Sequence, residues 1–183
     1  MVVSQNLKNN IVKHLILSMI SVLFVQCTKG NDDLLSLPLT PYTSNQLRID
    51  GYYYQIGYDG KTINSAYFFY GNGVLISTGG AKTSLMEMDS YIQKYYLHNQ
   101  SYKKVKYDWG VFMIEKSVIK FERWYPSEKP HKAFVREGII LNDTTFKITK
   151  SYYSNSSQHW TENETYHFRK FSPKPDSINT FIP

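Results

Sequence analysis

Turn residues divide this chain into short runs of strand-forming residues at regular intervals. Residues 47–56 alternate and include three consecutive tyrosines, Asp59 and Gly60 suit a tight turn, and residues 63–70 and 74–77 form the next two runs. Five more runs occupy residues 108–115, 118–125, 133–141, 144–153 and 164–171. Most neighbouring runs are joined by short turns, which predicts a mainly β fold of eight strands in an antiparallel meander.

The segment between the third and fourth runs has a helical period instead. Its apolar side chains recur every three or four residues, as on one face of a helix. They are Leu85, Met88, Ile92, Tyr95 and Tyr96. Ser84 followed by Glu87 fits a capping box, in which the serine accepts a hydrogen bond from a first-turn amide. We therefore expect one substantial helix, residues 85–97, inserted into the meander.

Apolar and polar side chains alternate in several runs and so lie on opposite faces of a strand. Ile119, Phe121 and Tyr125 share one face, and Arg123 lies among them. One apolar and one polar face per strand suits an antiparallel sheet around a single core. Eight such strands in sequence order can close into a barrel, which removes exposed sheet edges. The expected fold is therefore a closed antiparallel barrel with one inserted helix.

The first residues of the chain have the order of a bacterial export signal. Lys8 and Lys13 precede an apolar run, residues 15–25, which is shorter than the roughly 20 residues of a membrane-spanning helix. The only cysteine, Cys27, follows one residue later. The motif Phe24-Val25-Gln26-Cys27 resembles a lipobox, although Phe24 and Gln26 stand where Leu and a small residue are typical. The resemblance implies that Cys27 is lipidated; the alternative is an incidental cysteine with cleavage nearby.

These observations give a domain organisation and a location. Residues 1–26 are predicted to be a lipoprotein signal peptide, 27–46 a flexible tether, 47–171 the barrel, and 172–183 a tail that contains proline. The expected location is the cell envelope, lipid-anchored at Cys27, in the outer membrane of a Gram-negative bacterium. The periplasmic and surface sides both stay open, because the short charged cluster after Cys27 suits an export signal and a solvated leader equally.

Residues 47–171 resemble the lipocalin-like (calycin-like) domains of small bacterial lipoproteins. The resemblance is carried by the run Trp109-Gly-Val-Phe-Met-Ile-Glu and the following Ser117-Val-Ile-Lys-Phe-Glu, which look like a hairpin of such barrels. Asp50-Gly51-Tyr52 stands where lipocalins have Gly-x-Trp, and the helix lies in mid-chain instead of after the last strand. The resemblance implies a role in binding a hydrophobic ligand or a role in the envelope.

Composition argues against several function classes. The net charge is +6, but the basic residues are spread along the strands and form no concentrated patch, which disfavours nucleic-acid binding. The histidines lack the tight spacing of zinc ligands, and no phosphate-binding or nucleophile motif occurs, so we expect no metal, no cofactor and no catalytic residue. The abundant tyrosine and tryptophan residues suit barrel packing or stacking on sugars and hydrophobic ligands.

Two functions therefore compete, and a purely structural or inhibitory surface protein without a ligand pocket is a third possibility. The first is a non-enzymatic lipoprotein that binds a small amphiphile, a glycan or a partner. Its expected site is Trp109, Arg123 and Tyr125, because a charge on the core-facing side of a strand must open at the barrel mouth, pair with an acid such as Glu137, or meet an anionic ligand. The alternative is a hydrolase acting on envelope glycans or lipids. Its acids would come from Asp108, Glu115, Glu122 and Glu137.

Overall fold

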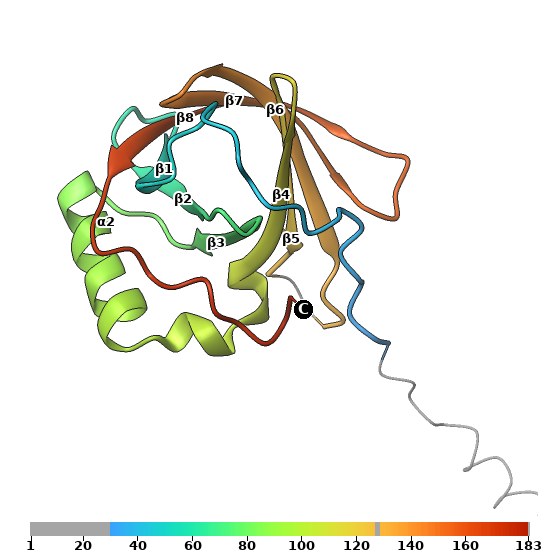
Figure 1. Cartoon of the computed structure of the whole chain (residues 1–183), viewed down its shortest axis with the longest axis horizontal. Coiled ribbons are helices and arrows are strands. Elements are labelled where there is room, and N and C mark those ends of the chain that lie inside the picture. Colours follow the sequence, from blue (N-terminus) through green and yellow to red (C-terminus); the bar gives the residue numbers. More distant parts are fainter. Residues whose placement is uncertain (1–29, 127–128, 183) are drawn as a thin grey trace, which may run out of the picture. The chain divides into compact units, whose positions relative to one another are not determined.

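The computed structural model of the protein describes residues 30–126 and 129–182. Eight strands, hydrogen bonded in sequence order, close into an antiparallel barrel (Figure 1). They are β1 (Gly51–Ile56), β2 (Ile63–Phe69), β3 (Val74–Thr78), β4 (Trp109–Glu115), β5 (Val118–Trp124), β6 (Ala133–Asn142), β7 (Thr145–Tyr153) and β8 (Trp160–Lys170). The predicted fold class is confirmed. The predicted signal peptide and Cys27 lie outside the described residues.

The inserted helix begins where the capping motif predicts. Helix α2 (Leu85–Ile92) starts after Ser84, whose Oγ accepts a hydrogen bond of 3.1 Å from the Glu87 amide. The Glu87 carboxylate reaches back one residue further than expected, to the amide of Thr83 (2.7 Å). The chain continues through a wider turn, η1 (Gln93–His98), and two short 3₁₀ turns, η2 (Ser101–Lys104) and η3 (Lys106–Asp108). None of these helices is long and apolar enough to cross a membrane.

Strand β8 begins four residues earlier than the sequence pattern predicts. Its first part carries Trp160, Glu162 and Glu164, and the pairing of β7 with β8 shifts register between Ile148 and Lys150. Glu162 accepts a short hydrogen bond from Ser151 of β7. Polar residues in a strand resemble a loop in sequence, and here they find their partners on nearby strands of the sheet.

The barrel centre is filled with aromatic and aliphatic side chains. They are Leu47, Tyr53, Tyr67, Phe69, Leu75, Phe112, Ile119, Phe121, Phe146, Ile148 and Tyr166. Phe69 lies in the middle of this set, with its ring centroid 4.8 Å from that of Phe112 and 5.9 Å from those of Phe121 and Phe146. Small eight-stranded barrels are just wide enough for side chains to fill. The centre of this barrel is therefore a packed core.

A second core covers the outside of β1 to β4. Outward-facing residues such as Tyr52, Phe68 and Ile76 pack under α2, the turns η1 and η2, and the end of the chain. The helix contributes Met88 and Ile92 to this contact, and both are fully buried. The three consecutive tyrosines of β1 thus divide between the two cores, since Tyr52 faces outward under the helix and Tyr53 faces inward.

The chain segments before β1 and after β8 lie on the barrel wall (Figure 1). The amides of Ser36 and Leu37 donate hydrogen bonds of 2.6 and 2.7 Å to the Glu122 carboxylate of β5. After β8, the Tyr70 hydroxyl donates to the carbonyl of Pro175 (2.7 Å). The Asp32 carboxylate also accepts a hydrogen bond of 2.8 Å from the His131 amide. The segment before β1 therefore makes specific contacts with the folded domain from Asp32 onward, although its composition is that of a tether.

Candidate functional site

The structure separates the three residues predicted to bind a ligand. Arg123 and Tyr125 lie on the inner face of β5 and beyond its end, at the mouth of the barrel. Trp109 faces outward, because Gly110 pairs with Arg123 in the β4–β5 register and successive residues of a strand alternate in direction. The Trp109 indole is fully buried and donates a hydrogen bond of 3.1 Å to the carbonyl of Tyr102. Trp109 is thus part of the outer core, on the opposite side of the barrel wall from the Arg123 side chain.

Arg123 is held by backbone carbonyls. Its Nη1 donates to the carbonyls of Tyr107 (3.3 Å) and Trp124 (3.2 Å), and its Nε is buried with no partner among the described residues. Glu137, the acid suggested as its partner, faces outward and pairs with Lys120 at 3.2 Å. At the rim, the Tyr125 ring packs 5.4 Å from that of Phe134. The aromatic rings of Tyr125 and Phe134 therefore border the mouth, and the Arg123 guanidinium lies further inside.

A second inward arginine, which the sequence analysis did not identify, lies below the mouth. Arg136 donates to Glu164 (2.5 Å) and to the Tyr166 hydroxyl (3.0 Å). Burial acts to raise the pKa of Tyr67, but Arg123 and Arg136 beside its hydroxyl lower it below its usual value. This polar network lies inside the barrel next to the aromatic core. The pockets described next all lie on the outside.

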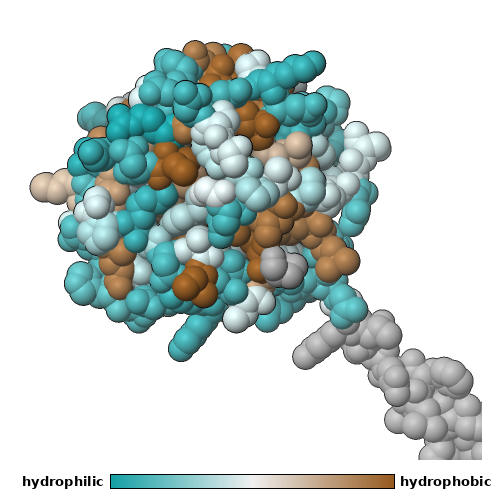
Figure 2. All heavy atoms as spheres, in the orientation of Figure 1, coloured by the Kyte–Doolittle hydropathy of each residue, from teal (hydrophilic) through white to brown (hydrophobic). Residues whose placement is uncertain are grey.

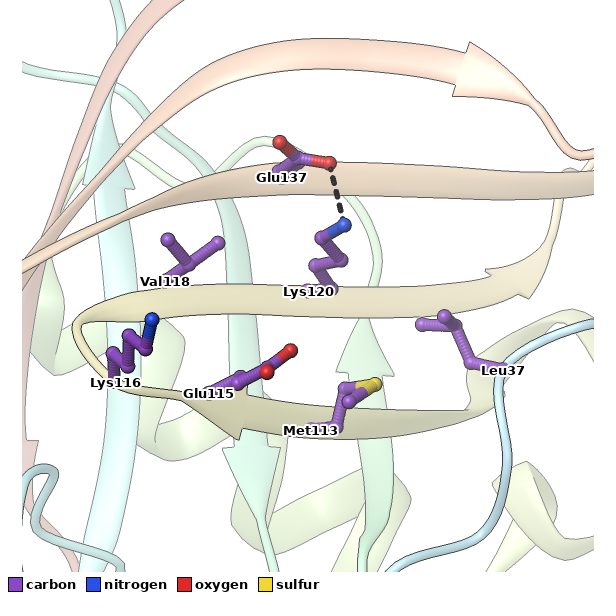
Figure 3. A pocket seen from close by; sticks show the side chains of 7 residues that line it. All are labelled: Leu37, Met113, Glu115, Lys116, Val118, Lys120 and Glu137. Atoms are coloured by element: carbon purple, nitrogen blue, oxygen red, sulfur yellow. Dashed lines mark ion pairs between the residues drawn. The ribbon is translucent and has the colours of Figure 1, made fainter.

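The first pocket is a groove of about 390 Å³ on the outer face of β4, β5 and β6 (Figure 3). Glu115 and Glu137, two acids of the hydrolase alternative, both line it. Lys120 extends toward Glu137, and its hydrogen bond to Glu137 raises the pKa of Lys120. Glu122 is fully buried and holds the segment before β1, and Asp108 lines a different pocket. The structure therefore brings together two of the four candidate acids.

Tyrosines make up half of the residues that line the second pocket. It measures about 330 Å³ and lies where the residues after β3 meet the end of α2 and the turns that follow it. We call it the tyrosine pocket; its lining is Gly79, Gly80, Tyr91, Tyr95, Tyr96, Ser101, Tyr102, Val105, Tyr107 and Asp108. Tyr95 and Tyr107 are 36% and 37% exposed, whereas Tyr96 and Tyr102 are buried and stack with centroids 5.1 Å apart. The one feature of the sequence that could have indicated this pocket is the presence of five tyrosines between residues 91 and 107.

Asp108 supplies an unusual carboxyl to the tyrosine pocket. Burial raises the pKa of Asp108 to about 7, and the nearby Arg123 guanidinium and Tyr96 hydroxyl only partly oppose this. Within the described residues, its one side-chain hydrogen-bond partner is the Tyr96 hydroxyl, at 3.4 Å from Oδ2. A carboxyl with a raised pKa and few partners in a cleft marks a candidate functional residue.

This raised pKa predicts how stability depends on pH. Between about pH 4 and 7 the folded protein holds a proton on Asp108 that the unfolded chain has released, so the free energy of unfolding should fall as the pH rises through this range. Urea unfolding of wild type and Asp108→Asn from pH 5 to 7.5 measures the effect. The free energy of unfolding of Asp108→Asn, measured relative to that of the wild type, should increase as the pH rises. Parallel curves would contradict the prediction. Lys174, whose pKa burial lowers to about 8, titrates above this window.

A third pocket lies near the point where the described chain begins. It is an apolar groove of about 270 Å³ between the first and last described segments. Its lining is Leu34, Leu35, Leu37, Leu39, Val111, Trp124, Phe181 and Ile182. Leu34 is 88% exposed, and Figure 2 shows hydrophobic side chains gathered on this part of the surface. A neighbouring pocket that shares Phe181 is bordered by Lys104, Lys106 and Lys129.

Comparison with known proteins identifies no relatives. No protein-family model, no curated protein and no solved structure matches the chain. Among the described residues, no group of three or more histidines, cysteines or acids lies close enough to hold a metal ion.

Proposed function

We propose that this protein is a lipid-anchored envelope protein whose barrel binds a ligand or partner on its outside. The observation that carries the binding part is the contrast between a centre filled with aromatic side chains and a tyrosine pocket that opens outward. Ligand pockets are typically concave and lined by aromatic side chains with a few polar groups, as the tyrosine pocket is. The barrel then serves as a rigid support for its outer surface.

The anchor is proposed at Cys27, in the outer membrane of a Gram-negative bacterium. Lys8, Lys13 and the apolar run before Cys27 support export and acylation. Each buried acyl methylene contributes about 0.8 kcal/mol, and stable anchoring takes two chains or more, so a triacylated cysteine would hold the protein firmly.

The apolar groove is consistent with a membrane nearby. Only residues 28–33 separate Cys27 from Leu34, and a stretch of that length spans at most about 25 Å. An anchored Cys27 would therefore keep the exposed Leu34 within reach of the bilayer surface. Lys104 and Lys129, which are exposed beside the groove, suit anionic lipid head groups.

Changing Cys27 to alanine tests the anchor. In a Gram-negative host fed labelled palmitate, the wild-type chain should incorporate the label and sediment with the membranes, whereas Cys27→Ala should incorporate none, because the thiol that forms the thioether is gone. Ser157→Ala, at an exposed position of the β7–β8 loop, serves as a control that keeps Cys27. Equal labelling of wild type and Cys27→Ala would refute lipidation at this residue.

A further inference from the structure

The ring faces of the tyrosine pocket suit a flat ligand with a weakly positive face. The centroids of Tyr91 and Tyr95 lie 4.8 Å apart, and Tyr95 and Tyr107 are each about one third exposed. Aromatic rings carry negative potential on their faces. The C–H groups on one side of a sugar ring are weakly positive, so such a ring can lie flat on an exposed tyrosine. A tyrosine offers this surface with little loss of conformational entropy.

The carboxyl of the tyrosine pocket can accept hydrogen bonds that the protein does not supply. An ionised carboxylate has about four acceptor sites, and the one side-chain partner of Asp108 among the described residues is the Tyr96 hydroxyl. That hydroxyl also lies 3.2 Å from the Ser77 carbonyl, which competes for its single proton. Two neighbouring hydroxyls of a ligand could donate to the two oxygens of Asp108 together.

The charges around the tyrosine pocket disfavour charged ligands of either sign. The Lys82 ammonium lies 4.0 Å from the centre of the Tyr91 ring, and the Lys94 ammonium lies 5.2 Å from the centre of the Tyr95 ring. Any ligand on Tyr95 would displace the ammonium of Lys94, which is an exposed and flexible side chain, but a cationic ligand would in addition be repelled by both lysines. An anionic ligand would meet the Asp108 carboxylate. A neutral ligand rich in hydroxyls avoids both conflicts.

We infer that the tyrosine pocket binds a neutral saccharide, with one sugar ring against Tyr95 and its hydroxyls donating to Asp108. The inference rests on the proposed ligand-binding function and names its ligand class. Residues Gly79 and Gly80 form the part of the wall without side chains, which gives a ring access to the carboxyl.

The inference can be tested by titrating saccharides into the full expressed chain, purified in detergent, and recording the amide signals by NMR. The probes are neutral gluco-, manno- and galacto-oligosaccharides, with a galacturonate oligomer as the anionic probe and a glucosamine oligomer as the cationic probe. At least one neutral probe should shift the amide signals of Gly79, Gly80 and Ser101. The charged probes should bind about tenfold more weakly, a difference of roughly 1.4 kcal/mol. Tighter binding of either charged probe, or no shift with any neutral probe, would overturn the inference.

Two variants locate the bound sugar. Tyr95→Ala should weaken binding about tenfold with the fold intact, because the Tyr95 ring is partly exposed. Asp108→Asn should weaken it and should also remove the rise in affinity expected between pH 5 and 8, as Asp108 loses its proton and becomes a better acceptor. Tyr58→Ala, at a tyrosine that is 96% exposed in the β1–β2 turn, is the matched control and should bind as wild type. Wild-type affinity in Tyr95→Ala would exclude this site.

Saccharide binding and lipid anchoring at Cys27 can be refuted independently of each other. A chain that incorporates palmitate at Cys27 but binds no neutral saccharide overturns the ligand class and leaves the lipoprotein in place. A chain that binds a saccharide at Tyr95 but incorporates no palmitate overturns the anchor alone.

Discussion

Replacing Phe69 by alanine should lower the free energy of unfolding by about 3–5 kcal/mol, the usual loss for a large aromatic side chain in a packed core. Phe69 is almost fully buried, and its ring contacts those of Tyr53, Tyr67, Phe112, Phe121 and Phe146. These neighbours come from β1, β2, β4, β5 and β7. They are fixed by the closed sheet and cannot collapse far into the space that the substitution leaves. Denaturant unfolding of wild type and variant measures the loss.

The same experiment distinguishes a filled barrel from a ligand-holding one. If the centre of the barrel held a ligand cavity, Phe69 would border a space and its removal would have a small effect. A change below about 1 kcal/mol would therefore contradict the packed interior. Tyr58→Ala, an exposed tyrosine in the β1–β2 turn, should change stability by less than about 0.5 kcal/mol and controls for the loss of an aromatic ring.

The strands and their closure could be predicted from the sequence because alternation is a local signal. Ile119, Phe121 and Arg123 share a face in the sequence and share it in the barrel. The same rule also separates Trp109 from Arg123. Trp109 and Arg123 are close to each other in the β4–β5 hairpin, which suggested that they share one site. Gly110, the residue after Trp109, is the partner of Arg123, so Trp109 faces the other side of the sheet. Register decides which face a side chain occupies, and a shift of one residue reverses it.

Contacts between distant segments could not be predicted, because nothing local signals them. The segment before β1 has the composition of a tether, and Glu122 lies on the face of β5 that reads as polar. The Glu122 carboxylate is nevertheless buried, because Ser36 and Leu37 cover it from more than 80 positions away. The tyrosine pocket follows the same logic, since the position of Asp108 beneath Tyr96 depends on how the turns after α2 fold back.

Glu122 is the expected site of the second large effect. Its carboxylate accepts hydrogen bonds from the amides of Ser36 and Leu37 and from the hydroxyls of Ser36 and Ser154. Hydrogen bonds to a charged group are worth about 1.5–3 kcal/mol each, and a buried donor left without an acceptor carries a penalty. Glu122→Ala should therefore reduce the free energy of unfolding by about 3 kcal/mol and release the segment before β1. Glu122→Gln keeps one accepting oxygen and the shape of the side chain, so it should fall between wild type and alanine.

Hydrogen exchange identifies which part of the chain loses protection when Glu122 is replaced. In Glu122→Ala the amides of Ser36 and Leu37 should exchange much faster, because their acceptor is gone, whereas the amide of Phe121, inside β5, should stay protected under native conditions. Unchanged protection of Ser36 and Leu37 would show that other contacts hold this segment. The result bears on the proposed anchor, because residues 31–37 connect the barrel to Cys27. If Cys27 is acylated as proposed, the hydrogen bonds from Ser36 and Leu37 to Glu122 limit how far the barrel can lie from the bilayer. Loss of these bonds in Glu122→Ala would then allow a larger separation.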